Sequence, residues 1–466
     1  MTRAWSMQAR RPRRRRFVAG AVLATLLVTG VVSGAVSLAP GAGPASAGAR
    51  RLGATPAPAT AAAPAAIPPG SAGDGVPSAA PSNAAAVAPP PAPPVDPATA
   101  AALQKALEAA RKAMVIPGIE ATVILADGRT WTGVAGDAVA ATHAKVTPQT
   151  PFPIASVTKT FTAALILRLA EQGRLTIDDP LARWMPDYPN AAHITLRMLL
   201  THTSGLADFF QNPKLDTALN KAKGRVWTPA EVLPFVAKPA FAPGKGWGYS
   251  NTNYVLLGLV AERAGGAPWA DQVREDFFVP LGLASTYVQG VGTPSVPPAH
   301  SNQMFIGYGG KILPRDLSDG STIAPFTAVA TAAYSAGSIA STTADLARWA
   351  RALYGGDVLA PASLAEMLTF DPDITRYAAL AYGLGVSRVK VDGRFAAVGH
   401  TGALAGTRAS IRWLPAQRVS VAVLFNRDLF TGDDATRFLI AALYPRAKPV
   451  ASPGASSPSP APSALP

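Results

Sequence analysis

Residues 153–167 read PIASVTKTFTAALIL, and the rest of the chain is organised around this stretch. Pro153 marks the entry to a helix, Ser156 occupies a position that helix N-termini favour, and an apolar run follows until Gly173. Ser156 and Lys159 are three residues apart, so a helix places them on one face, where hydroxyl and amine can touch. The stretch predicts a buried helix with a nucleophile on its first turn.

A serine hydroxyl becomes a good nucleophile only when a neighbouring base takes its proton. A lysine amine can be that base when burial lowers its pKa, and an apolar helix supplies burial. The helix N-terminus adds N–H groups that favour a developing oxyanion. The alternative is a helix cap followed by a surface lysine, and Ser-x-x-Lys alone does not separate the two.

The chain contains a second Ser-x-x-Lys, at residues 387–390. It lies in an alternating stretch that predicts a strand, where residues three apart point to opposite faces. We therefore interpret Ser387 and Lys390 as a decoy.

The first 47 residues predict an export signal. Nine arginines and no acid lie in residues 1–51, an apolar stretch covers residues 17–38, and Ala45-Ser46-Ala47 has the form of a cleavage site. The segment Arg14-Arg15-Arg16-Phe17-Val18 resembles a twin-arginine signal, with Arg13 in place of the usual Ser or Thr, and favours that route over the general secretory one. An uncleaved anchor made by residues 17–38 is the alternative. Either route predicts an extracellular or cell-envelope protein.

Residues 48–95 and 447–466 are rich in Ala, Pro, Gly and Ser and lack the large apolar residues that a core needs, which predicts a disordered linker and a disordered tail. The folded domain is expected at residues 96–446. Removing the nine N-terminal arginines from the formal charge of +14 leaves +5, which gives no reason to expect nucleic-acid binding. No cysteine occurs and the five histidines lack metal-ligand spacing, so no metal and no cofactor are expected.

The pattern of residues 96–446 predicts one antiparallel sheet whose strands come from the two ends of the domain, with a long helical insertion between them. A helix begins at Asp96-Pro97, and strands at 119–125 and 130–134 flank the turn Asp127-Gly128. Further strands are expected near the end, at residues 382–391, 394–398, 407–414 and 419–425, followed by a helix over 433–443. Between them, helices are predicted at residues 156–172, 194–201, 228–237, 252–264 and 343–354.

Two more constellations carry chemistry. Tyr249-Ser250-Asn251 combines a phenol that can relay a proton beside a lysine with an amide that can donate to and accept from a substrate amide. Asn251 could instead cap the next helix, and Tyr188-Pro189-Asn190 is a second copy of the pattern. Gly399-His400-Thr401-Gly402 lies at a strand, where glycines allow close approach to a ligand; the alternative is a turn with a surface histidine.

In this order, Ser-x-x-Lys, Tyr-x-Asn and His-Thr-Gly resemble the penicillin-recognising serine hydrolases, in the branch of class C β-lactamases, D-alanyl-D-alanine carboxypeptidases and related esterases. The segments Leu199–Leu206, Ser335-Ala336-Gly337 and Tyr382–Gly385 support the resemblance. It implies an α/β (α+β) β-lactamase/transpeptidase-like fold, in which a five-stranded antiparallel sheet flanked by helices joins an all-helical region.

The resemblance also implies roles. Ser156 is the acylated nucleophile, Lys159 and Tyr249 share proton transfer, and Asn251 holds the substrate amide. His400, Thr401 and Gly402 line the opposite wall, and the N–H groups of Ser156 and Ala403 form the oxyanion hole. The partner is a small-molecule or peptide substrate (a cell-wall peptide, an ester or a β-lactam), and the protein is expected to be a monomer.

Three departures from the family pattern guide the functional prediction. Class C β-lactamases have lysine where this chain has His400, Ala403 replaces a common hydroxyl residue, and Ser387 stands where carboxypeptidases carry a carboxylate-binding arginine. Arg388 would face the other way on a strand. We predict a D-alanyl-D-alanine carboxypeptidase-like peptidase acting on cell-wall peptides, with esterase or β-lactamase as the alternative. A catalytically silent penicillin-binding or surface-interaction protein is the alternative of another class.

Overall fold

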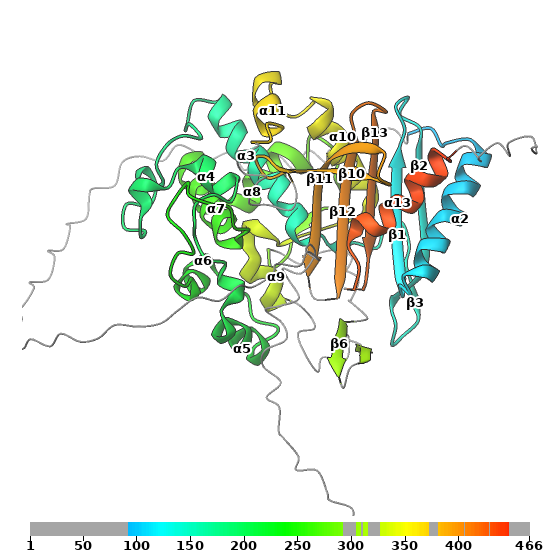
Figure 1. Ribbon diagram of the computed structural model, residues 1–466, viewed down its shortest axis with the longest axis horizontal. Coiled ribbons are helices and arrows are strands. Elements are labelled where there is room, and N and C mark those ends of the chain that lie inside the picture. The colour runs from blue at the N-terminus through cyan, green and yellow to red at the C-terminus, as the bar shows by residue number, and fades with distance from the viewer. Residues whose placement is uncertain are drawn as a thin grey trace, which may run out of the picture. The chain divides into compact units, whose positions relative to one another are not determined.

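A computed structural model describes residues 92–291, 304–308, 311–315, 327–371, 381–404, 406–427 and 429–446 (Figure 1). The predicted export signal, the tail and nearly all of the predicted linker lie outside these residues. Within them, no helix combines the length and the apolar character that crossing a bilayer requires.

The main sheet is antiparallel throughout, in the order β3-β2-β1-β13-β12-β11-β10-β9. Its strands are β1 (Gly118–Ile124), β2 (Thr130–Val139), β3 (Ala144–Lys145), β9 (Ala381–Tyr382), β10 (Ser387–Val391), β11 (Phe395–Leu404), β12 (Thr407–Leu414) and β13 (Val419–Phe425). Within the described residues, the sheet therefore has eight strands where five were expected. Two of the additional strands, β3 and β9, are two-residue extensions of its edges, too short for an alternating pattern to reveal.

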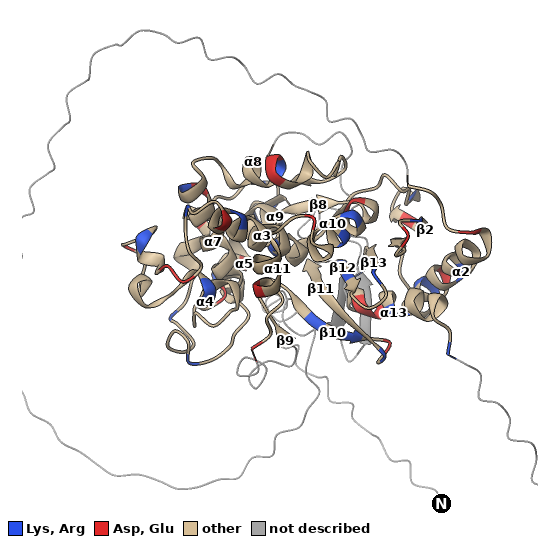
Figure 2. Ribbon diagram, turned by 90° about the horizontal axis from the view of Figure 1, so that it is seen from above, with Lys and Arg blue, Asp and Glu red and all other residues tan. Residues whose placement is uncertain are grey.

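Helices cover both faces of the sheet. Seen from above, α10 (Thr343–Gly355) and α13 (Gly432–Leu443) lie on opposite sides of β12 and β13, and α2 (Pro97–Ala113) packs beside α13 (Figure 2). Alternate β1 residues enter different cores: Ile119, Ala121 and Val123 join the cluster under α2, whereas Ile124 joins the larger cluster on the α10 side. Glu120 and Thr122, which share the α10 side, are also buried.

The helical region lies beside the β11 side of the sheet (Figure 1). Its central element, α3 (Thr158–Glu171), is buried at eleven of its fourteen positions and packs against α7 (Asn251–Gly265). The surrounding helices are α4 (Leu196–Leu200), α5 (Pro213–Lys221), α6 (Pro229–Val232), α8 (Trp269–Val273), α9 (Thr327–Ala333) and α11 (Pro361–Met367). A helix that is buried on nearly every side needs neighbours all round, which explains the insertion.

Two smaller sheets accompany the main one. β4 (Phe152–Pro153) pairs with β8 (Ile339–Ser341), which also pairs with β5 (Tyr287–Val288); β6 (Met304–Tyr308) pairs with β7 (Lys311–Arg315). β4 ends three residues before Ser156, so its pairing with β8 anchors the entry to α3.

Candidate active site

Ser156 lies in a short 3-10 turn, η1 (Ala155–Val157), immediately before α3. The sequence pattern favoured a helix-capping position for Ser156, but its side chain does not cap the helix. The hydroxyl instead accepts a hydrogen bond from Lys159 Nζ at 3.0 Å. Ala155 has φ 48°, a left-handed conformation that costs a non-glycine residue about 1 kcal/mol or more. The strained turn leaves Ser156 partly exposed while its neighbours are buried.

Lys159 is fully buried, and its Nζ meets three acceptors: Ser156 Oγ at 3.0 Å, Asn251 Oδ1 at 2.7 Å and the Ala336 carbonyl at 2.8 Å. Burial lowers the pKa of Lys159 to about 7, although the nearby Asp208 carboxylate opposes this shift. A large share of the amines is therefore neutral near pH 7. A neutral amine has a lone pair that can accept the Ser156 proton.

Tyr249 precedes α7, and the Ser156 hydroxyl lies close enough to the Tyr249 phenol to oppose the burial-driven rise of the Tyr249 pKa. Lys159 Nζ lies 5.0 Å from the centre of the Tyr249 ring. Burial raises the pKa of Tyr249, so the phenol stays protonated at neutral pH. Tyr249 can therefore donate or relay a proton beside Ser156, whereas Lys159 is the group that can accept one.

Asn251 is the first residue of α7, and its side chain does not cap that helix. The amide oxygen accepts from Lys159 Nζ, and Nδ2 donates to Asp208 Oδ2 at 2.9 Å. The amide has a second N–H, which is the group that could hold a substrate carbonyl.

His400 is buried on β11, with both ring nitrogens engaged: Nε2 meets the Tyr382 hydroxyl at 2.9 Å and Nδ1 meets the Thr401 carbonyl at 2.5 Å. A carbonyl only accepts, so Nδ1 carries the hydrogen and Nε2 accepts from Tyr382. Burial lowers the pKa of His400 to about 3, with the Lys159 charge acting in the same direction. The imidazole is therefore neutral, not the surface histidine of the alternative interpretation.

Gly402 brings β11 against the Ser156 turn. A Cβ atom at this position would lie 2.0 Å from the Ile154 carbonyl oxygen, so only glycine permits the approach. Thr401 and Ala403 flank it on the strand. The oxyanion hole expected from the N–H groups of Ser156 and Ala403 stays a prediction.

The second Ser-x-x-Lys lies on a strand, β10, as its alternating pattern predicts. Ser387 is buried, donates to the Gly399 carbonyl and accepts from Arg412 Nη1, both at 3.0 Å, whereas Lys390 is exposed. Arg388 is exposed too, with its guanidinium 4.5 Å from the centre of the Phe370 ring. The two ends of this motif point apart, in contrast to Ser156 and Lys159.

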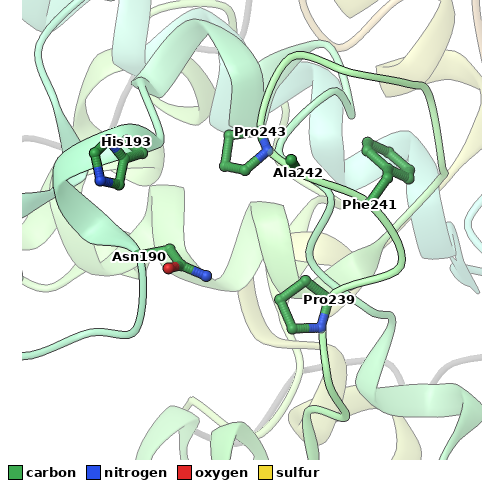
Figure 3. Close-up of a pocket in the computed structure, with 6 residues that line it drawn as sticks. All are labelled: Asn190, His193, Pro239, Phe241, Ala242 and Pro243. Carbon is green, nitrogen blue, oxygen red and sulfur yellow. The ribbon is translucent and has the colours of Figure 1, made fainter.

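The second Tyr-x-Asn lies elsewhere. Asn190 has φ 62° and lines an open hollow of about 700 Å³ (Figure 3). The other lining residues are His193, Pro239, Phe241, Ala242 and Pro243. None of the residues around Ser156 lines this hollow, and within the described ranges Asn190 has no lysine partner comparable to that of Asn251.

Sequence reasoning missed the roles of Asp208, Tyr382 and Ala336 around this site. Two of them had a signal in the sequence, because Tyr382 lies in the segment 382–385 that supports the resemblance and Asp208 lies two residues after the segment 199–206. Ala336 contributes only its carbonyl, which every residue possesses. In the part of the chain that the structure describes, no group of three His, Cys, Asp or Glu side chains could hold a metal ion.

A family profile described as Beta-lactamase matches residues 103–444. Penicillin-binding protein 4* of Bacillus subtilis (strain 168) is 32% identical over 227 residues, which cover 46% of this chain and 47% of that protein. Esterase EstB of Burkholderia gladioli is 39% identical over 147 residues, covering 29% and 37%. The aligned parts thus span about half or less of these two relatives.

Among solved structures, the D-amino acid amidase of Ochrobactrum anthropi SV3 in complex with L-phenylalanine amide has a TM-score of 0.64 and 26% identity to this chain. The match covers 74% of this chain and 98% of the amidase. The likeness therefore includes nearly the whole of that fold.

Proposed function

The chain belongs to the beta-lactamase family, and on that premise we propose that it is a serine hydrolase that works through an acyl-enzyme on Ser156. The observation that carries the proposal is the contact between Ser156 Oγ and a fully buried Lys159 whose pKa falls to about 7. An amine that is largely uncharged near neutral pH lies 3.0 Å from a partly exposed hydroxyl, which places a base beside a reachable nucleophile.

In the first half of the reaction, Ser156 Oγ attacks the carbonyl carbon of the acyl donor while Lys159 takes the hydroxyl proton. The N–H groups of Ser156 and Ala403 would stabilise the resulting oxyanion. The C–N or C–O bond then breaks, and the leaving group receives a proton from Lys159, directly or through the Tyr249 hydroxyl. Water attacks the acyl-enzyme in the second half, returning the Ser156 hydroxyl and releasing the acid.

For the acyl donor we propose a peptide or amide with a D-amino acid on the acyl side, with D-alanyl-D-alanine cell-wall peptides as the physiological case. The names of the relatives support this class: a penicillin-binding protein and a D-amino acid amidase. A cell-wall substrate requires export, which residues 1–47 predict.

Ester hydrolysis is the second candidate. Among the described residues, the cationic side chains near the wall formed by His400, Thr401 and Gly402 already interact with other groups. His400 is neutral, the Arg412 guanidinium pairs with Asp433 through Nε–Oδ1 at 2.8 Å and Nη2–Oδ2 at 2.7 Å, and Arg388 stacks on Phe370. A wall without a free cation favours leaving groups that lack a carboxylate. For the same reason, β-lactams should acylate Ser156 slowly and be hydrolysed poorly.

The test uses a fluorescent fluorophosphonate and a fluorescent penicillin on wild-type protein and two variants. Ser156→Ala should abolish labelling, whereas the matched control Ser387→Ala should keep it. Turnover of a D-Ala-D-Ala peptide, a D-amino acid amide, a short ester and a cephalosporin then ranks the substrate classes. Labelling that persists in Ser156→Ala would show that the nucleophile lies elsewhere, and fastest turnover of the cephalosporin would make β-lactamase the function.

A further inference from the structure

The segment 202–209, here called the 202–209 loop, holds the start of α7 through hydrogen bonds to the four consecutive residues 250–253, the N-cap residue and the first three of the helix. The bonds are Ser250 N to His202 Nδ1 (3.2 Å), Asn251 Nδ2 to Asp208 Oδ2 (2.9 Å), Thr252 Oγ1 to the Ala207 carbonyl (2.7 Å), Phe209 N to Thr252 Oγ1 (3.2 Å), Ser204 Oγ to Asn253 Oδ1 (2.6 Å) and Asn253 Nδ2 to His202 Nδ1 (3.0 Å). Only one of these contacts reaches a side chain that touches Lys159: that of Asp208 with Asn251.

Asp208 uses both carboxylate oxygens. Oδ1 accepts from Phe210 N at 3.1 Å and Oδ2 accepts from Asn251 Nδ2. An asparagine at this position has a single acceptor oxygen and could satisfy only one of the two donors. The site therefore requires a carboxylate, although Asp208 is only 8% exposed and a buried charge is costly.

The Asp208 contact decides which way the Asn251 amide points. With Nδ2 held by Asp208, Oδ1 faces the Lys159 amine and accepts from it. If the amide turned over, its NH₂ group would face the donating ammonium, which gives no hydrogen bond. Fixing the amide also fixes the second Nδ2–H, the group left for a substrate.

Asp208 also supplies a charge. Titratable groups from the surrounding elements face Lys159: Asp208 and His202 from the loop, Tyr249 and Tyr254 from the start of α7, and His400 with Tyr382 from the sheet side. Burial lowers the pKa values of both histidines and raises those of the tyrosines, so these groups are neutral near pH 7. Burial raises the pKa of Asp208 only to about 6, so within this set Asp208 carries the negative charge.

Resting on the proposed function of Ser156 and Lys159, we propose that Asp208 is a positioning residue that locks the Asn251 amide and sets the pH at which Lys159 becomes able to accept the Ser156 proton. A negative charge nearby favours the protonated amine. Removing it should therefore let Lys159 lose its proton at lower pH, while the loosened amide should slow the reaction.

The experiment measures the rate of Ser156 labelling by a fluorophosphonate from pH 5 to pH 9 for wild-type protein and Asp208→Asn. For the variant we expect a plateau about tenfold lower and an acid limb shifted about one unit toward lower pH. The control is Ser204→Ala, which removes a buried bond between the same loop and the next residues of α7. It should lower the melting temperature and leave the acid limb in place.

The outcomes separate the two proposals. Wild-type protein that is not labelled at Ser156 contradicts the proposed function. If wild-type protein is labelled but the acid limb of Asp208→Asn coincides with the wild-type limb or lies at higher pH, the proposed role of Asp208 is overturned and the proposed function is not. If Asp208→Asn does not fold, Asp208→Ser, smaller and also uncharged, should show the same shift. Failure of both variants to fold would assign Asp208 to folding and overturn the proposal.

Discussion

Lys159 and Glu120 are both fully buried, and each lies beside a hydroxyl group. Lys159 Nζ is 3.0 Å from Ser156 Oγ, and Glu120 Oε1 accepts from Thr343 Oγ1 at 2.7 Å and from Thr343 N at 3.2 Å. Burial lowers the pKa of Lys159 to about 7 and raises the pKa of Glu120 to about 8. By titration alone, either pair would qualify as a catalytic base with its hydroxyl.

What separates the pairs is access. Ser156 is partly exposed on a strained turn, whereas Thr343, the first residue of α10, has no exposed surface. Lys159 gives each of its three hydrogens to an acceptor, but Glu120 Oε2 has no partner among the described residues. A shifted pKa therefore marks a buried group, and only a reachable hydroxyl makes that group a candidate for catalysis.

The largest expected effect comes from breaking the Lys159 side of this comparison. Lys159→Arg keeps a cation but cannot give up its proton near neutral pH, so fluorophosphonate labelling of Ser156 should slow about a thousandfold or more. Single-turnover labelling rates measure this, with Lys390→Arg as the control that should behave as wild type. Near-normal labelling of Lys159→Arg would remove Lys159 from the mechanism.

The Glu120 side should affect stability rather than activity. Its folded pKa of about 8 lies above the ordinary 4.5, so the folded state binds the extra proton and stability is lost as pH rises between these values. Glu120→Gln removes this dependence. Relative to the variant, wild-type protein should lose about 2–3 kcal/mol of unfolding free energy between pH 5 and pH 7, at about 1.4 kcal/mol per unit.

Urea unfolding of both proteins at several pH values measures the difference, and labelling of Ser156 should stay within twofold. Exposed Glu108→Gln on α2 is the matched control, expected to follow the wild-type pH dependence. Parallel stability curves for wild type and Glu120→Gln would mean that Glu120 is ionised in the folded protein.

Much of this arrangement was predictable because it depends on local patterns. An alternating pattern predicted the hairpin strands 407–414 and 419–425, and the structure contains them as β12 and β13. Helical spacing predicted the contact between Ser156 and Lys159, and the structure contains that contact too. The expected strand 382–391 is instead two strands separated by a turn. Gly385 there has φ 71°, and a Cβ would lie 2.6 Å from Ala163 Cβ on α3, a tertiary contact with no local signature.

The smallest effect tests a charge that is near the sheet edge but exposed. Arg388→Ala should change kcat/KM by less than about twofold, because exposed charges contribute little. This should hold both for a D-Ala-D-Ala peptide with a free carboxylate and for the corresponding peptide amide. Lys390→Ala on the same strand is the control. A loss of kcat/KM above tenfold that is confined to the peptide with a free carboxylate would show that Arg388 binds this carboxylate. Exposure of a charged side chain would then not identify it as unimportant for activity.

The pairing of β1 with β13 has a consequence for the newly made chain. Ile119 lies opposite Phe425, so the sheet cannot close until about 300 further residues have followed β1 out of the ribosome, which takes roughly 15–60 s at the usual rate of translation. During that time Ser156 and Lys159 have been made, but Ala336 and then β11 are still to come. In a nascent chain, the proposed nucleophile and its lysine are therefore made well before the carbonyl and the strand that complete their surroundings.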